Sequence, residues 1–302
     1  MTPVRVESGI DAGLAWHYGD PLREQRGLDG VVDLSNRAVV RVTGPDRGRW
    51  LREYGTAWLG GLGAGELASG ELAAGETASY LFLDTEGFVR YGLAVVETGA
   101  EIWGWTEPGQ GEALAAYLAE RVTGWLVGVE QRPDQAVVWS GRELGEGVSR
   151  TGCLGGVETF VTRRRLAAVL RAGEPAGLWA YTARRIAAGV PRLGVDTDDR
   201  TSPAELGAVG GETTRVARTA GTRRLVRAYL DGSDETWPAV GVDLCREPGG
   251  VPIGRLGSTA YHHELGLIGL GLVDRTIADG ATVWAGGVPA TVESVTGEAV
   301  TA

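Results

Sequence analysis

Short apolar runs that alternate with polar residues fill the first half of the chain and predict strands rather than long helices. The run at 39–42 ends in the Gly-Pro-Asp turn at 44–46, whose aspartate is placed to cap a helix after it. Runs at 79–83 and 88–96 are joined by a glycine-containing turn and predict a hairpin, and the run at 102–105 predicts a third strand. This half of the chain therefore predicts an α+β layer.

The pattern changes to helical spacing at 110–122, where Leu114, Leu118 and Val122 recur on one face. A second set of strands and helices follows, with strands at 137–139 and 159–161 and helices at 163–171 and 176–188. From residue 224 onward, short strands separated by Gly, Pro and Asp turns predict a small β-barrel. Elements in this order predict an α+β protein of more than one domain.

Composition narrows the class of partner. The chain of 302 residues has 39 acidic and 29 basic residues, a formal charge of −10, so we expect no nucleic-acid partner. Every basic residue is an arginine, which excludes Schiff-base and P-loop lysine chemistry. Residues 1–15 do not resemble a signal peptide and no run reaches membrane-spanning length, so we expect a cytoplasmic protein with no membrane partner. Cys153 and Cys245, with three histidines, form no spaced metal set, so we expect no metal.

The segment 183–207 leaves a helix through Gly189 and Pro191 and enters an acid-rich loop. Its spacing, R-x-x-A-G-x-P-R-x-G-x-[DE]-x-D followed by T-x-P-x-E-x-G, resembles the signature of folate-binding proteins related to the T-protein (aminomethyltransferase) of the glycine cleavage system. Within that superfamily it is most similar to the YgfZ-type proteins linked to iron–sulfur cluster maintenance. The stretches HYGDPLREQR at 17–26 and HHELG at 262–266 resemble the same family's opening helix and C-terminal barrel, so the resemblance covers nearly the whole chain.

The resemblance implies a three-domain, T-protein-like cloverleaf. Two α+β layer domains and a small β-barrel would surround a central cavity, in which the T-protein binds tetrahydrofolate. We expect the first domain at 1–45 with 135–207, the second at 46–134 and the barrel at 222–302.

Three working parts of that family are absent from the sequence. The glutamate that holds the pterin in the family's R-L-E-A-G matches Ala187, whose methyl group cannot accept a hydrogen bond. The aspartate that assists at the folate N5 matches Gly92. The cysteine of the K-G-C-Y-x-G-Q-E-T motif is missing between Gly207 and the surviving Gly-Glu-Thr at 211–213, where 208–210 form a shortened connection. The resemblance thus implies tetrahydrofolate as cofactor, whereas positions 92 and 187 do not favour it.

Seven polar or aromatic residues are expected at the central cavity as ligand-binding candidates: Asp196, Arg192, Trp103, Trp105, Glu107, Tyr80 and Tyr91. Asp196 matches the acid of the family's G-x-[DE] step and either binds the ligand or braces its loop. Arg192 either faces the ligand or pairs with loop acids. Trp103 and Trp105 share one strand face by their spacing of two, and such a pair would suit a flat conjugated ligand.

His262 and His263 lie in a turn between two predicted barrel strands. Adjacent residues on extended backbone point in opposite directions, so at most one of them faces the cavity. That histidine is the candidate general acid or base, because an imidazole titrates near neutral pH. A surface position in the turn is the alternative.

Three functions remain open. The lack of an acid at positions 92 and 187 favours the first of them. The first is an enzyme that uses the family's cavity on a specialised, biosynthetic, planar or aromatic small molecule without folate. The second is a tetrahydrofolate-binding one-carbon transferase or an iron–sulfur maintenance protein. The third is a non-enzymatic partner protein, for which the only support is the repeated Gly-Glu-Leu-Ala within 65–74.

Overall fold

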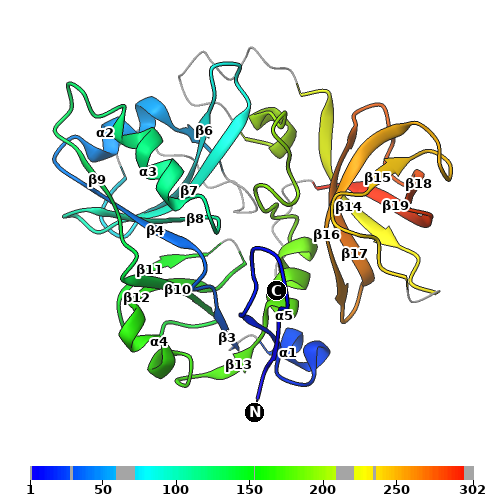
Figure 1. Ribbon diagram of the computed structural model, residues 1–302, viewed down its shortest axis with the longest axis horizontal. Helices are drawn as coiled ribbons and strands as arrows, with labels where there is room; N and C mark the ends of the chain where they lie inside the picture. The colour runs from blue at the N-terminus through cyan, green and yellow to red at the C-terminus, as the bar shows by residue number, and fades with distance from the viewer. Residues whose placement is uncertain are drawn as a thin grey trace.

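A computed structural model describes residues 2–27, 30–58, 72–152, 154–208, 221–233 and 236–295. Two mixed lobes and a closed barrel surround a centre that is crossed by helix α5 (Leu178–Ala187) (Figure 1). The predicted α+β class and the C-terminal barrel are confirmed. Cys153, most of the repeated Gly-Glu-Leu-Ala and the Gly-Glu-Thr at 211–213 lie outside the described residues. The described helices are too short or too polar to span a bilayer.

The first lobe is built on a five-stranded sheet in the order β11-β12-β10-β3-β13. Its strands are β3 (Gly30–Asp33), β10 (Gln135–Ser140), β11 (Val148–Thr151), β12 (Val157–Thr162) and β13 (Glu174–Ala176). Nearby lie the ribbon of β1 (Val4–Arg5) and β2 (Ala15–His17) and the helices α1 (Pro21–Arg26) and α4 (Arg163–Val169). Every residue of β10 is buried, because strands pair with it on both sides.

The second lobe is a six-stranded sheet in the order β5-β6-β7-β8-β4-β9. Its elements are β4 (Ala38–Thr43), α2 (Arg47–Tyr54), β5 (Thr56–Ala57), β6 (Thr77–Leu83), β7 (Val89–Glu97), β8 (Ile102–Thr106), α3 (Gly111–Ala119) and β9 (Gly128–Gln131). The predicted hairpin and third strand are β6, β7 and β8. By strand pairing, β4 belongs to this sheet although it precedes residue 46. Asp46 occupies the N-cap position of α2 as predicted, but its carboxylate makes no cap hydrogen bond and instead accepts the Leu126 N–H at 2.9 Å.

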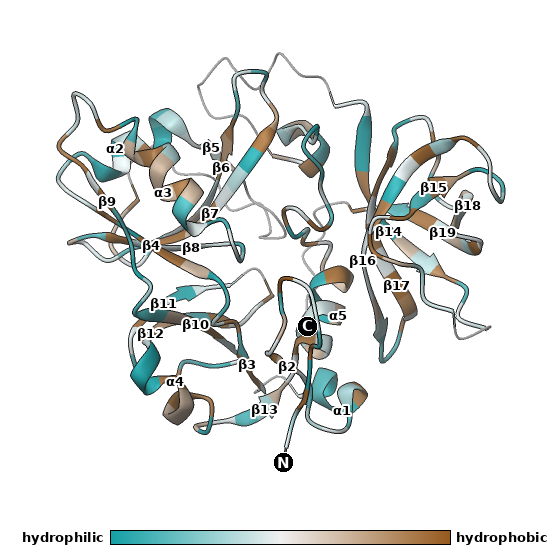
Figure 2. Ribbon diagram, viewed as in Figure 1, coloured by the Kyte–Doolittle hydropathy of each residue, from teal (hydrophilic) through white to brown (hydrophobic). Residues whose placement is uncertain are grey.

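The barrel closes in the order β14-β17-β16-β15-β18-β19. Its strands are β14 (Arg223–Leu230), β15 (Asp243–Cys245), β16 (Pro252–His262), β17 (Gly266–Asp274), β18 (Thr282–Ala285) and β19 (Val288–Ser294). Alternate residues of β14 and β19 point inward, and Val226, Ala228 and Val292 are fully buried in its core. Figure 2 shows this alternation as mixed brown and teal segments along the barrel strands.

Helix α5 joins the lobes to the barrel. Its Ala183 and Ile186 are fully buried in a cluster with Ala260 and Ile268 of the barrel. Gly189 follows the C-cap residue Ala188, and its φ of 69° is in the left-handed region that favours glycine. The loop after it runs to a short 3-10 helix, η1 (Pro203–Leu206), that begins with a capping box. The signature segment therefore lies at the centre of the molecule.

Candidate functional site

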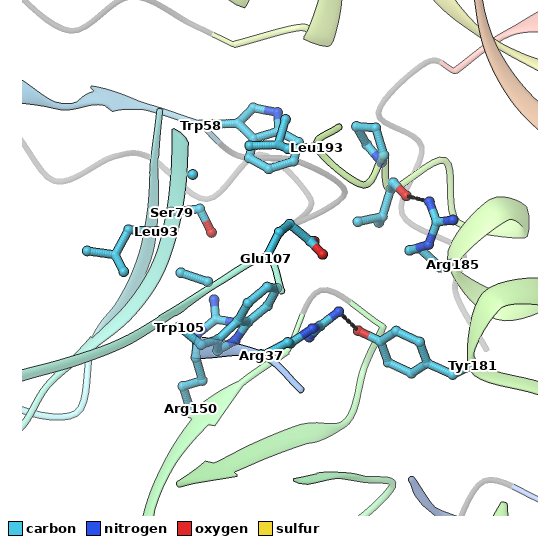
Figure 3. A pocket seen from close by; sticks show the side chains of 14 residues that line it. Arg37, Trp58, Ser79, Leu93, Trp105, Glu107, Arg150, Tyr181, Arg185 and Leu193 are labelled. Carbon is cyan, nitrogen blue, oxygen red and sulfur yellow. Dashed lines mark hydrogen bonds between the residues drawn. The ribbon is translucent and has the colours of Figure 1, made fainter. Parts of the chain in front are cut away.

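A cavity of about 60 Å³ lies where the two sheets meet α5 and the loop after it (Figure 3). Its polar lining consists of Arg37, Ser79, Glu107, Arg150, Tyr181 and Arg185. Among the described residues, none from the barrel contributes to this lining. A volume of 60 Å³ holds about four to six water molecules, at roughly 10–15 Å³ each. The cavity as it stands therefore accepts a ligand of only a few non-hydrogen atoms.

Two arginines share one carboxylate beneath the cavity. Glu158 is 1% exposed and accepts Arg37 Nη1 at 3.4 Å and Arg150 Nη1 in a short contact. The Trp105 indole N–H donates to the same carboxylate at 2.6 Å, and the Arg37 guanidinium lies 3.7 Å from the centre of the Trp105 ring. Arg37 also donates to the Tyr181 hydroxyl at 3.0 Å, as the dashed line in Figure 3 shows. This network fixes the positions of both guanidinium groups and of the Trp105 indole.

Glu107 and Arg192 meet at the end of β8. Arg192 Nε donates to Glu107 Oε2 at 2.7 Å, and its two terminal nitrogens donate to Asp11 at 2.5 and 2.8 Å. Burial alone would lower the pKa of Arg192, but the two carboxylates raise it well above its usual value. Glu107 is 8% exposed, and its Oε1 has no hydrogen-bond partner among the described residues. Glu107 lines the cavity, so its carboxylate brings to this site an oxygen without a hydrogen-bond partner in the described part of the chain.

Asp196 lies beside the cavity, in the loop between α5 and η1. It braces this loop, which we call the signature loop. It is 1% exposed and accepts Arg185 Nη1 at 2.6 Å, the Arg192 N–H at 2.7 Å and the Ser258 N–H at 2.6 Å. A Cβ at Gly257 would lie 2.3 Å from Asp196 Oδ1, so the barrel approaches this closely only because residue 257 is glycine. These contacts favour the loop-bracing alternative for Asp196.

A larger, more open cleft of about 310 Å³ also contacts Arg37. Its other arginines are already paired. Arg132 donates to both oxygens of Asp134 at 2.9 Å, and Arg163 donates to backbone carbonyl groups at 2.8 and 2.9 Å. The smaller cavity, with its open Glu107 oxygen, is therefore the candidate site.

The comparisons with known proteins find a match in fold but none in sequence. No protein-family profile matches the sequence, and no curated protein matches it. The structure matches the crystal structure of the glycine cleavage system aminomethyltransferase T from Bartonella henselae with a TM-score of 0.74. The match covers 97% of this chain and 93% of that chain at 18% sequence identity. The chain has the aminomethyltransferase fold. The predicted T-protein-like architecture is therefore confirmed, while the YgfZ-type relationship stays a prediction.

Positions 92 and 187, which the sequence resemblance matches to the acids of the T-protein, differ in their surroundings. A Cβ at Gly92 would lie 2.6 Å from Leu193 Cδ1. Leu193 is 7% exposed and packs with Leu81 and Leu206, so it occupies the space that a side chain at position 92 would need. Ala187 packs with the apolar cluster of α5 and the barrel, and its methyl group does not line the cavity.

Three aromatic candidates lie outside the lining of the cavity. Trp103 packs on Phe160 with ring centroids 6.0 Å apart and donates to Glu101 at 2.8 Å. Tyr80 is 3% exposed in the core of the second lobe, and burial raises its pKa to about 12. Tyr91 packs on a neighbouring tyrosine at 5.5 Å. The expected floor of Trp103 and Trp105 is therefore not formed, because of these two only Trp105 lines the cavity and Arg37 covers part of its ring.

The two candidate histidines also lie outside the cavity lining. They are at the β16–β17 turn, where His262 Nδ1 accepts the N–H groups of Glu264 and Leu265, both at 3.2 Å. The His263 N–H donates to Gln25 of α1 at 3.0 Å. Burial and the neighbouring His263 lower the pKa of His262. Neither histidine lines this cavity, because the turn packs toward α1.

The arginine network was not predicted from the sequence. Arg150 and Glu158 are directly opposite each other in the register of β11 and β12. A charged residue inside the apolar run V-E-T-F-V at 157–161 was the available signal, because buried charges require a partner. Arg37, at the entry to β4, carries no comparable pattern.

Proposed function

We propose that this protein is a small-molecule enzyme that uses the cavity of an aminomethyltransferase fold without tetrahydrofolate. The observation that supports it is the open Glu107 Oε1 at a cavity that also holds the guanidinium groups of Arg37 and Arg150. A carboxylate at such a place can exchange a proton with a bound molecule, and the arginines can orient it. Glu107 is accordingly the proposed general acid or base, and the arginines are ligand-binding residues.

The residues around this cavity do not fit a pterin held through positions 92 and 187. Leu193 covers Gly92, and the Ala187 side chain has no acceptor atom. An apolar cavity that holds benzene has a volume of about 150 Å³, and this one has about 60 Å³. A planar or aromatic substrate would require Leu193 or Trp58 to move away from the lining, whereas a smaller polar substrate would not.

The direct test is to identify what the purified protein carries or selects. Native mass spectrometry of the full chain, followed by release and identification of bound molecules, is paired with a thermal-shift screen of a metabolite library. We expect one ligand class to be bound by the native protein and by the control Glu143→Gln, an exposed position, and to be lost in Glu107→Gln. Binding of tetrahydrofolate in this screen would favour the one-carbon alternative. A chain that selects no small molecule would contradict the proposal.

A further inference from the structure

Two ionic clusters of opposite composition meet at the cavity. One contains two arginines and a single carboxylate, and the other contains two carboxylates and a single arginine. Each cluster is held together by hydrogen bonds within the protein, so its composition does not depend on a ligand. The pair of clusters gives the cavity a positive side and a negative side.

The positive side consists of Arg37, Arg150 and Glu158. The two arginines are 4% and 3% exposed, so water compensates little of their charge. Arg150 uses Nε toward the Val95 carbonyl and Nη1 toward Glu158, and its Nη2 has no hydrogen-bond partner among the described residues. This side therefore has a donor available for an anionic group such as a carboxylate.

The negative side consists of Glu107, Asp11 and Arg192. One guanidinium serves both carboxylates, and Glu107, which lines the cavity, has an Oε1 with no hydrogen-bond partner among the described residues. Glu107 also contributes to raising the pKa of Arg37, which places the two clusters within electrostatic reach of each other. This side therefore has an acceptor available for a cationic group such as an ammonium.

We infer that the ligand of this cavity is a small zwitterion of the amino-acid class, with its carboxylate toward Arg150 and its ammonium toward Glu107. The inference rests on the proposed small-molecule function and names its substrate class. A zwitterion carries one charge of each sign, so it complements both clusters and leaves the total charge of the site unchanged. The volume of about 60 Å³ matches a molecule with few non-hydrogen atoms, which favours the smallest amino acids over aromatic ones.

Calorimetric titration of the full chain with glycine, L-alanine and L-serine tests the inference. Acetate lacks the ammonium and methylamine lacks the carboxylate, so they are the matched half-ligands. We expect saturable binding of at least one amino acid and about 10-fold or weaker binding of both half-ligands. Arg150→Met and Glu107→Gln should each weaken that binding by about 10-fold or more. The exposed controls Arg164→Met and Glu143→Gln should leave it unchanged.

Two results would overturn the inference. The first is binding of acetate as tight as that of the amino acid, since the negative side would then not be used. The second is a cavity ligand, identified by mass spectrometry, that carries only one kind of charge or none. In that second case the proposed small-molecule function would stand and only its substrate class would fall. If Arg150→Met fails to fold, Glu107→Gln and the half-ligands still decide the question.

Discussion

At the scale of single residues, the cavity is shaped by side chains that depend on one another. Gly92 lacks a side chain, and Leu193 fills the space above it. Glu158 is buried, and two arginines and an indole N–H satisfy it. Removal of one member of a buried charged set leaves the others without compensation, which typically costs several kcal/mol. The cavity is therefore maintained by pairs and triads of residues rather than by single ones.

The pairing of Gly92 with Leu193 predicts a coupling between substitutions. Gly92→Asp alone should lower the free energy of unfolding by about 1–3 kcal/mol, because the new side chain meets Leu193 Cδ1. In a Leu193→Ala background, Gly92→Asp should lower the free energy of unfolding by less. The difference between the two effects should be about 0.5–3 kcal/mol. Urea denaturation of the four proteins measures this cycle. Strictly additive effects would show that the two positions do not compete for space.

His262 provides a second test at this scale. Because burial lowers its pKa, the folded protein binds fewer protons at this site than the unfolded chain does below pH 6.5. The contribution of His262 to stability should thus be present above pH 6.5 and decline as the pH falls through the folded-state pKa. NMR titration of the imidazole should give a midpoint below 6.5. A midpoint above 6.5 would contradict the burial of this side chain in the turn.

At the scale of elements, the signature loop is held by carboxylates that reach the helix and the barrel. Asp196 joins the loop to α5 and β16, and Asp198 joins it to β14 through both terminal nitrogens of Arg223 at 2.6 and 3.0 Å. The loop is therefore part of the packing between lobes and barrel.

The substitution Asp196→Asn tests whether Asp196 stabilises its loop or binds the ligand. The change leaves buried Arg185 without its counterion, so we expect a loss of about 3–5 kcal/mol in the free energy of unfolding. Affinity for a ligand of the cavity should change by less than about threefold in the variant that still folds, because Asp196 does not line the cavity. Denaturation and calorimetry on the same protein measure both quantities. A tenfold loss of affinity with unchanged stability would restore Asp196 as a ligand-binding residue.

The Asp198–Arg223 pair predicts a pH dependence. The Arg223 hydrogen bonds lower the pKa of Asp198 from 3.8 to about 2. Its stabilisation should be complete above pH 4 and be lost as the pH falls through 2. Asp198→Asn should therefore lower the free energy of unfolding by about 1–2 kcal/mol at pH 7, allowing for partial exposure, and by much less at pH 2.5. An equal difference at both pH values would exclude this pair as its source.

Sequence reasoning reached the elements more readily than the contacts among them. Helices at 110–122, 163–171 and 176–188 were predicted from periodicity, and α3, α4 and α5 lie within these ranges. The pairing of Arg37 with Glu158 spans more than a hundred positions in the chain, and no local pattern encodes it. The position of the two histidines away from this cavity has the same origin, since the direction in which the β16–β17 turn packs is set by tertiary contacts with α1.

At the scale of the whole molecule, the chain has the aminomethyltransferase fold, and we propose that its centre serves a ligand other than tetrahydrofolate. The fold match covers nearly the whole chain, and the cavity lies between the two mixed lobes. Fold alone does not fix the reaction, which depends on the residues of the site. The central claim is therefore that this cavity serves a small ligand without tetrahydrofolate.

Isothermal titration of the purified full chain with tetrahydrofolate under reducing, oxygen-free conditions tests this claim most directly. We predict no saturable heat at tetrahydrofolate concentrations up to about 1 mM. A dissociation constant of about 1 mM corresponds to a binding free energy of only about 4 kcal/mol. The Gly92→Asp/Leu193→Ala protein provides the comparison, since it introduces an acid at position 92 and the space for it. Saturable micromolar binding by the native chain, weakened by Glu107→Gln and unaffected by Glu143→Gln, would contradict the account.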